Sequence, residues 1–145
     1  MPRVEASIAI NRPVAEVFAF VTNFANATQW QPGIIEARVT SNGPVGVGTT
    51  FTWVQQIVGQ KMDTSGQVTA CNPPNEYQWK STAGPFPLSG GVKFRAEGNS
   101  TVLTQYADAE PGGFFKLAEG LLMKQVQGQF EQGLKKLKQV LEAGA

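Results

Sequence analysis

The chain has 145 residues, of which 16% are charged, and its 12 lysines and arginines nearly balance its 11 aspartates and glutamates, for a net charge of +1. It contains no histidine and a single cysteine, Cys71. These counts exclude Ser-His-Asp and Cys-His nucleophilic sites, histidine-ligated metal sites and an intramolecular disulfide. The near-neutral charge also differs from that of a typical nucleic-acid-binding protein, so we expect no nucleic-acid partner.

The length predicts one domain over residues 1–145, because a chain of this size buries roughly 70% of the surface that its unfolded form exposes. The N-terminal sequence MPRVEASIAI is interrupted by Pro2, Arg3 and Glu5, unlike the apolar core of a signal peptide. No other window approaches the roughly 20 apolar residues that span a bilayer. The sequence therefore predicts a cytoplasmic protein without stable membrane insertion.

The first third of the chain predicts one strand and two short helices. Residues 3–10 alternate between apolar and polar, which is typical of a half-buried strand. Residues 11–13, Asn-Arg-Pro, favour a helix start. The following apolar residues recur at helical spacing up to about Asn23, and a second short helical segment covers residues 26–31 before Pro32-Gly33 ends it.

From Ile34 to Tyr106 the sequence predicts an antiparallel meander of about six strands, separated by turns rich in glycine and proline. Alternation assigns one inward face to each strand. We predict Gly66 and the pair Gly90-Gly91 to mark bulges or bends that curl the sheet. The predicted inward residues of the later strands are Phe51, Trp53, Gln55, Ile57, Met62, Thr64, Gly66, Val68, Ala70, Tyr77, Trp79, Ser81, Leu88, Gly90, Val92, Phe94, Val102, Thr104 and Tyr106.

The segment after Pro111-Gly112-Gly113 predicts a long amphipathic helix. Gly133 lies within its apolar sector, where it would make room for close packing or for a ligand. The residues of that sector are Leu122, Met123, Val126, Phe130, Leu134, Leu137, Val140 and Leu141.

The order and spacing of several short motifs make the whole chain resemble one known group of proteins. It is similar to the helix-grip proteins, the Bet v 1-like and START-related (SRPBCC) superfamily, and in particular to their polyketide cyclase/dehydrase branch. The residues that carry the resemblance are Pro13, Val17, Phe18 and Asn23, Trp30-x-Pro32-Gly33-Ile34, Gly46-x-Gly48-Thr49-x-Phe51-x-Trp53, Pro73-Pro74-x-x-Tyr77-x-Trp79, and Gly98-x-x-Thr101-x-Leu103-Thr104.

The resemblance implies an α+β, helix-grip fold. In this fold a seven-stranded antiparallel sheet curls round a long C-terminal helix, two short helices lie between strands 1 and 2, and an apolar cavity separates sheet and helix. It does not imply a reaction, because lipid carriers, aromatic-polyketide cyclases, hormone receptors and chaperone activators share the fold. Function must therefore be argued from the site.

The inward aromatic residues, with polar neighbours on the same face, are typical of a site for a hydrophobic small molecule. The alternative is that the aromatic residues only pack the sheet against the helix and that the polar residues pair with one another. We expect no cofactor and no metal. The candidate ligand-binding residues are Phe51, Trp53, Gln55, Thr64, Tyr77, Trp79, Phe94, Thr104, Tyr106, Val126 and Phe130.

The sequence leaves several functional hypotheses open. The leading one is binding of a hydrophobic, aromatic or lipid-like small molecule in the central cavity. The alternative is a polyketide cyclase or dehydratase that positions its substrate, with Tyr106 and Asp108 as acid-base candidates; Asp108 could instead be a solvated acid at a strand end. A third hypothesis is a protein-interaction or membrane-recruitment module. The oligomeric state, monomer or dimer, stays open.

Overall fold

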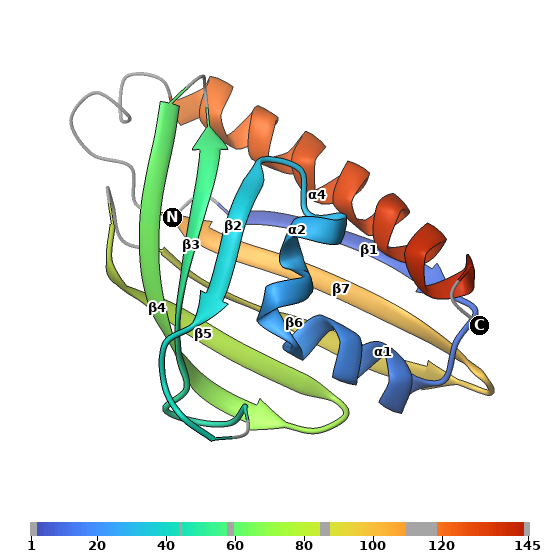
Figure 1. Cartoon of the computed structure of the whole chain (residues 1–145). Helices are drawn as coiled ribbons and strands as arrows, with labels where there is room; N and C mark the ends of the chain where they lie inside the picture. Colours follow the sequence, from blue (N-terminus) through green and yellow to red (C-terminus); the bar gives the residue numbers. More distant parts are fainter. Residues whose placement is uncertain (1–2, 44, 58–59, 85–87, 110–118, 144–145) are drawn as a thin grey trace.

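The computed structural model describes residues 3–43, 45–57, 60–84, 88–109 and 119–143. Seven strands form a single sheet in the order β1-β7-β6-β5-β4-β3-β2, with all neighbours antiparallel. The predicted helix-grip architecture is confirmed (Figure 1). In chain order the elements are β1 (Arg3–Ile10), α1 (Val14–Thr22), the 3₁₀ turn η1 (Phe24–Asn26), α2 (Ala27–Trp30), β2 (Ile34–Val39), β3 (Thr50–Ile57), β4 (Gln60–Asn72), β5 (Glu76–Ala83), β6 (Leu88–Glu97), β7 (Ser100–Ala109) and α4 (Glu119–Ala143).

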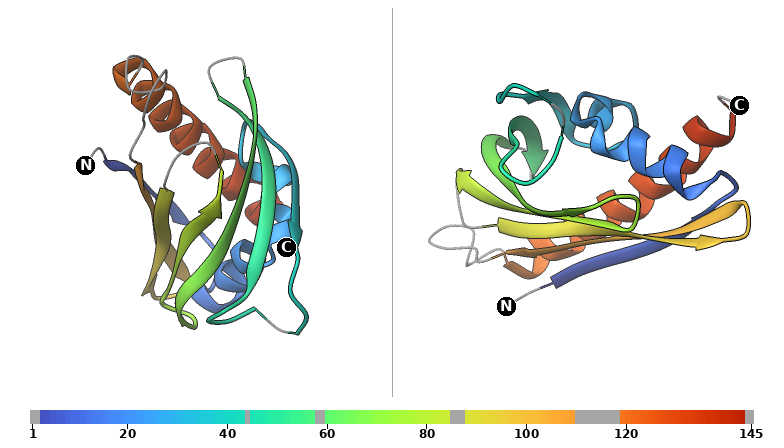
Figure 2. Two further views of the ribbon diagram at one scale, coloured as in Figure 1. Left: turned by 90° about the vertical axis from the view of Figure 1, so that its left-hand side faces the viewer. Right: turned by 90° about the horizontal axis from the view of Figure 1, so that it is seen from below.

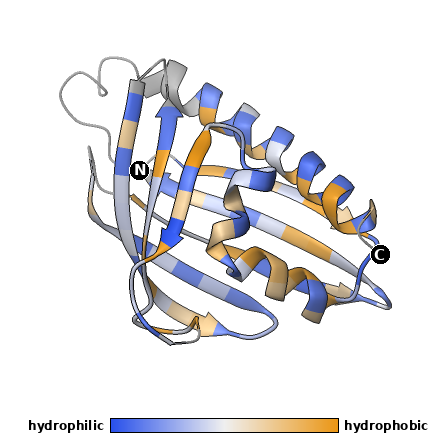
Figure 3. Ribbon diagram, viewed as in Figure 1, coloured by the Kyte–Doolittle hydropathy of each residue, from blue (hydrophilic) through white to orange (hydrophobic). Residues whose placement is uncertain are grey.

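The helices lie on the concave side of the curled sheet (Figure 2). Apolar and polar residues alternate along the elements, as the periodicities predict (Figure 3). The fully buried residues of the core come from all layers: Ile10 and Leu103 from the sheet, Val17 from α1, and Leu134 and Leu137 from α4. None of the described helices combines the length and the apolarity needed to cross a bilayer. The predicted helical residues 114–118 lie outside the described part of the chain.

Strand β7 turns the opposite face inward from the one predicted. Its register pairs Leu103 with Ile8 and Ala107 with Val4, the apolar residues of β1. Leu103 and Gln105 therefore face the helices, and the prediction that Thr104 and Tyr106 face inward is wrong. Along residues 101–108, the odd-numbered and the even-numbered positions both contain polar and apolar side chains, so the pattern does not show which set faces inward. The pairing of β7 with β1 decides it.

The glycines of β6 are not at a bulge, contrary to the prediction. The pairing of β6 with β5 and β7 runs through Gly90 and Gly91 without a register shift, whereas β2 and β4 do shift register, β4 at Gly66 among other places. A Cβ atom on Gly91 would lie 2.7 Å from the Tyr106 hydroxyl and 2.5 Å from the Tyr77 carbonyl oxygen. Gly91 is thus required because the Tyr106 ring lies across it.

The C-terminal end of α4 is held by the turn between β1 and α1. The Arg12 guanidinium donates to the carbonyl oxygens of Leu141 at 3.0 Å and Glu142 at 2.9 Å. The Asn11 backbone N–H donates to the Glu142 carboxylate at 2.8 Å. Arginine and these last carbonyl groups complement each other, because the final turn of a helix has unpaired acceptors and a partial negative charge.

The same helix covers the edge of the sheet. The Gln127 amide donates to the Glu5 carbonyl oxygen at 3.0 Å, and the Lys138 ammonium donates to that of Ala9 at 2.8 Å. Both acceptors belong to β1, which is an edge strand of the sheet that the described residues form. Side chains of α4 thus satisfy part of an edge that would otherwise be open to pairing with another chain.

We expect Arg12→Ala to lower the free energy of unfolding by about 1.5–3 kcal/mol, the range for hydrogen bonds to a charged group. The matched control is Arg95→Ala, because Arg95 forms an exposed pair with Glu97, with 71% and 56% of the two side chains accessible. The control should cost no more than about 1 kcal/mol. Urea denaturation measures both, and equal losses would contradict the role given to Arg12.

Candidate functional site

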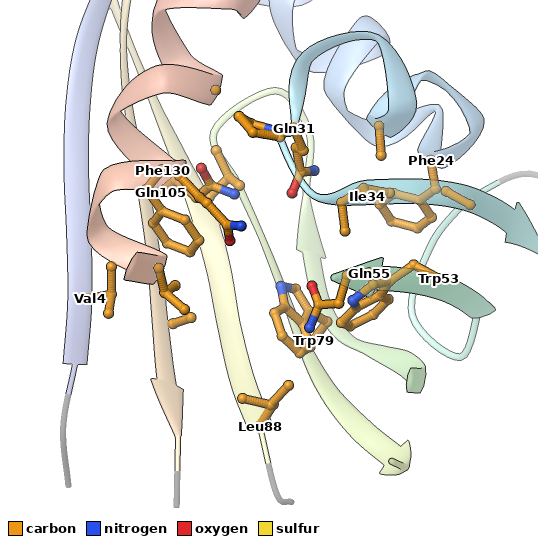
Figure 4. A pocket seen from close by; sticks show the side chains of 18 of the residues that line it. Val4, Phe24, Gln31, Ile34, Trp53, Gln55, Trp79, Leu88, Gln105 and Phe130 are labelled. Atoms are coloured by element: carbon orange, nitrogen blue, oxygen red, sulfur yellow. The ribbon is translucent and has the colours of Figure 1, made fainter. Parts of the chain in front are cut away.

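A cavity of about 150 Å³ lies between the concave face of the sheet and the middle of α4 (Figure 4). Val126 and Phe130 of α4 line it, whereas Leu134, Leu137 and Leu141 of the same helix belong to the core. The apolar stripe of α4 thus has two uses: its C-terminal part packs against α1 and the sheet, and its earlier part forms a wall of the cavity.

Aromatic rings from β3, β5 and η1 form the opposite wall. Phe51 and Trp53 stack with their ring centroids 5.2 Å apart, and Trp79 meets Trp53 edge-to-face at the same distance. Phe24 packs on Phe51 at 4.9 Å and closes the wall from the helical side. Each ring is therefore held by a neighbouring ring, which leaves a stiff apolar surface facing the cavity.

Seven of the eleven candidate residues line this cavity with the inward side chains that the sequence predicted. They are Phe51, Trp53, Gln55, Tyr77, Trp79, Val126 and Phe130.

Two inward candidates are buried elsewhere. Phe94 packs edge-to-face on Phe18 of α1 at 5.0 Å and belongs to the core, because α1 covers that end of β6. Thr64 is fully buried, but it does not line the cavity. Its side chain lies next to Gly84 instead. Its Oγ1 has no hydrogen-bond partner among the residues that the structure describes.

The two candidates from β7 point to the convex face. The Thr104 hydroxyl forms a hydrogen bond with that of Ser7 at 2.7 Å. Tyr106 borders the cavity, but its ring lies on the other side of the sheet, 4.9 Å from the Arg3 guanidinium carbon. Its hydroxyl donates to the Glu76 carboxylate at 3.3 Å. Burial, followed by the nearby Glu76 carboxylate, raises the pKa of Tyr106.

Asp108 also lies on the convex face, which is a correction to its nomination as a general base at the cavity mouth. The Arg3 guanidinium donates to both of its carboxylate oxygens, at 2.8 and 3.0 Å. These hydrogen bonds lower the pKa of Asp108. A carboxylate that is paired and hard to protonate on the wrong face of the sheet cannot serve chemistry inside the cavity.

The sequence prediction missed Phe24, Gln31 and Gln105, which also line the cavity. One signal could have found Gln105. Alternation along the first strand places Arg3 outward, and its charge complements that of Asp108. Placing both on the outer face puts Gln105, three residues before Asp108, on the inner face.

The polar side chains in the cavity are neutral. Gln31 is the C-cap residue that follows α2, Gln55 lies on β3 and Gln105 on β7, and their amides extend into the same space (Figure 4). None of these three amides has a hydrogen-bond partner among the described residues. Tyr77 is the inward phenol, and burial raises its pKa, so it stays protonated.

The described lining contains no charged residue, and no group of three or more Asp, Glu, Cys or His residues that could hold a metal ion exists in the described ranges. Cys71 is a free thiol whose pKa is raised by burial. The arrangement offers ring surfaces, amides and one neutral phenol. It can bind, orient and desolvate a small molecule, and its means of moving protons are few.

We expect Asp108→Asn to lower stability slightly at neutral pH. The folded-state pKa of Asp108 is lowered, so its contribution is present above the ordinary aspartate pKa and is lost as the pH falls through the lowered value. The difference between wild type and variant should therefore close below about pH 4. Urea denaturation at several pH values measures it, and a gap that widens in acid would contradict the ion pair.

Comparisons with known proteins agree with this architecture. A protein from Thermus thermophilus superposes with a TM-score of 0.86 at 23% identity, covering 99% of this chain and 100% of that one. A START superfamily protein from Mycobacterium smegmatis gives a TM-score of 0.81 at 17% identity, covering 99% of both chains. The Zhui aromatase/cyclase from Streptomyces sp. R1128 gives 0.82 at 12% identity, covering 97% of this chain and 93% of that one.

No curated protein sequence matches the chain. The profile of one protein family, described as "Polyketide cyclase / dehydrase and lipid transport", matches residues 1–142. With the helix-grip fold and the cavity between its sheet and long helix, the match shows that this chain belongs to that polyketide cyclase/dehydrase and lipid transport family.

Proposed function

We propose that this protein binds a hydrophobic small molecule, aromatic or lipid-like, in the cavity between the sheet and α4, and does so in the cytoplasm. The observation that carries the proposal is the wall of Phe51, Trp53 and Trp79 rings facing a cavity whose described lining has no charge. Rings that only filled the core would leave no such space between them and the helix.

The size of the cavity favours an aromatic ring over a long acyl chain. A cavity of about 150 Å³ lined by apolar side chains accommodates benzene, and this cavity has that volume. A buried ring removes about 150–250 Å² from water. At about 25 cal/mol per Å² this contributes roughly 4–6 kcal/mol before the cost of association. We therefore expect dissociation constants near the millimolar range for single-ring probes.

A second candidate function is cyclisation of a polyketide-like substrate. Two observations favour it: the family of the chain, and its structural similarity to the Zhui aromatase/cyclase and to one part of StfQ, a di-domain aromatase/cyclase from the steffimycin biosynthetic pathway. Such an enzyme could act mainly by holding a flexible chain near its cyclised shape. Tyr106 and Asp108 face the other side of the sheet, so Tyr77 is the phenol that could donate to a substrate carbonyl.

The binding function is tested by filling the cavity. Ala107 lines it from β7, whereas Ala9 lies on the outer face of β1. We expect toluene to bind the wild type and Ala9→Phe, with a negative heat-capacity change, and Ala107→Phe to lose binding because its ring occupies the space. Calorimetry and the fluorescence of Trp53 and Trp79 measure this. Failure of toluene to bind at millimolar concentration, or equal binding to both variants, would overturn the proposal.

The second function is tested with a β-keto thioester substrate. Under the cyclase hypothesis, Tyr77→Phe should reduce turnover while toluene still binds, because only the hydroxyl is removed. Tyr106→Phe is the matched control and should leave turnover unchanged, because its hydroxyl bonds to Glu76 on the convex face. Absence of turnover in the wild type, or the same loss in both variants, would count against this function.

A further inference from the structure

The cavity holds more hydrogen-bonding capacity than the fold uses. Gln31 follows α2, Gln55 lies on β3 and Gln105 lies on β7, and each places a primary amide at the cavity. Gln105 is only 9% exposed, with Ala6 and Val92 as its cross-strand neighbours. Among the described residues, Thr64 Oγ1 is the fully buried side-chain atom without a partner, so the Gln105 amide keeps some contact with the solvent-accessible space of the cavity.

A fourth amide shows the contrast. Gln129 also lines the cavity, but its Nε2 donates to the Gln56 carbonyl oxygen at 3.4 Å and lies against Gly33. Gln129 thus connects α4 to the end of β3, which is a structural role. Gln31, Gln55 and Gln105 have no such bond to any described residue. Their unused donors and acceptors are free to meet a bound molecule.

The charge of the lining restricts what that molecule can be. The Arg3 guanidinium, a nearby cation, lies on the convex face and is bonded to Asp108. An ionised group brought into the cavity would therefore lose water without gaining a counter-charge among the described lining residues. An amide both donates and accepts, so amides suit a neutral ligand group that can do the same.

We propose that the ligand is an uncharged single-ring aromatic molecule whose polar substituent both donates and accepts hydrogen bonds, and that Gln31, Gln55 and Gln105 form hydrogen bonds with that substituent. This inference rests on the proposed binding function, and it adds the ligand's charge and its polar group. In this arrangement the ring of the ligand would lie against the aromatic wall of Trp53 and Trp79, and its substituent would point to the glutamine amides, which Figure 4 shows at the cavity.

Three probes test the inference: toluene, benzamide and benzoate. All carry one ring, but only benzamide is neutral and able both to donate and to accept. We expect benzamide to bind the protein at least about tenfold more tightly than benzoate at neutral pH, because the benzoate carboxylate would lose water without a counter-charge among the described lining residues. Titration followed by tryptophan fluorescence and calorimetry gives the three dissociation constants.

Two variants then identify the groups responsible. Gln105→Leu should weaken benzamide binding about tenfold relative to toluene binding, and raise the Tm of the ligand-free protein, because it replaces a mostly buried polar side chain that has no partner among the described residues by an apolar one. Gln139→Leu, an exposed position on α4, is the matched control and should change neither affinity. If Gln105 served the fold, its substitution would instead lower the Tm. Gln55→Leu provides the same test at a second amide if Gln105→Leu does not fold.

The outcomes separate this inference from the proposed function. If toluene binds but benzamide binds no better than benzoate, or if neither glutamine variant alters benzamide affinity, the inference is overturned and the binding function stands. If toluene fails to bind at millimolar concentration, the binding function itself is overturned, and the inference falls with it. A preference for benzamide that Gln105→Leu or Gln55→Leu abolishes supports both.

Discussion

The structure depends on how a curled sheet covers its apolar concave face. Among the described elements, α4 is the one long helix that can do so, and it is anchored at its C-terminal end, where Arg12 donates to the carbonyl groups of Leu141 and Glu142. There Leu134 and Leu137 pack tightly with α1 and the sheet. Nearer its N-terminus the same apolar stripe faces a cavity instead of a packed layer. The cavity therefore follows from the position of the helix, and its walls are the aromatic residues that the sheet presents inward.

The two faces of the sheet divide the chemistry of the molecule. On the convex face, Arg3 pairs with Asp108 and lies over the Tyr106 ring, which itself lies across Gly91. These charged groups thus interact with one another and with solvent. On the concave face, the described lining of the cavity keeps amides and one protonated phenol. The description of the family includes cyclases. Because of this division, however, the cavity of this chain is better equipped to bind a molecule than to transfer protons.

Much of the site was predictable because the strands that form its aromatic wall alternate clearly. Phe51, Trp53 and Gln55 are alternate residues of β3 and follow turn glycines. In this strand only one of the two alternating sets is strongly apolar, so the pattern predicts that their side chains point inward. The prediction failed on β7, where both parities mix polar and apolar residues. There the aromatic character of Tyr106 suggested the wrong face. Phe24 was missed for another reason: it sits in a short 3₁₀ turn, where no periodicity indicates direction.

The sequence by itself determined the order of the elements and the absence of histidine chemistry, because periodicity and composition are local properties of the chain, and the resemblance of its motifs to the helix-grip proteins implied the fold. Tertiary structure decided which glutamines enter the cavity, which aromatic rings pack instead in the core, and where Asp108 points. These depend on register between strands distant in sequence, and a shift of one residue exchanges the two faces. Pairing β7 with β1 moved Tyr106 and Asp108 out of the site and brought Gln105 into it.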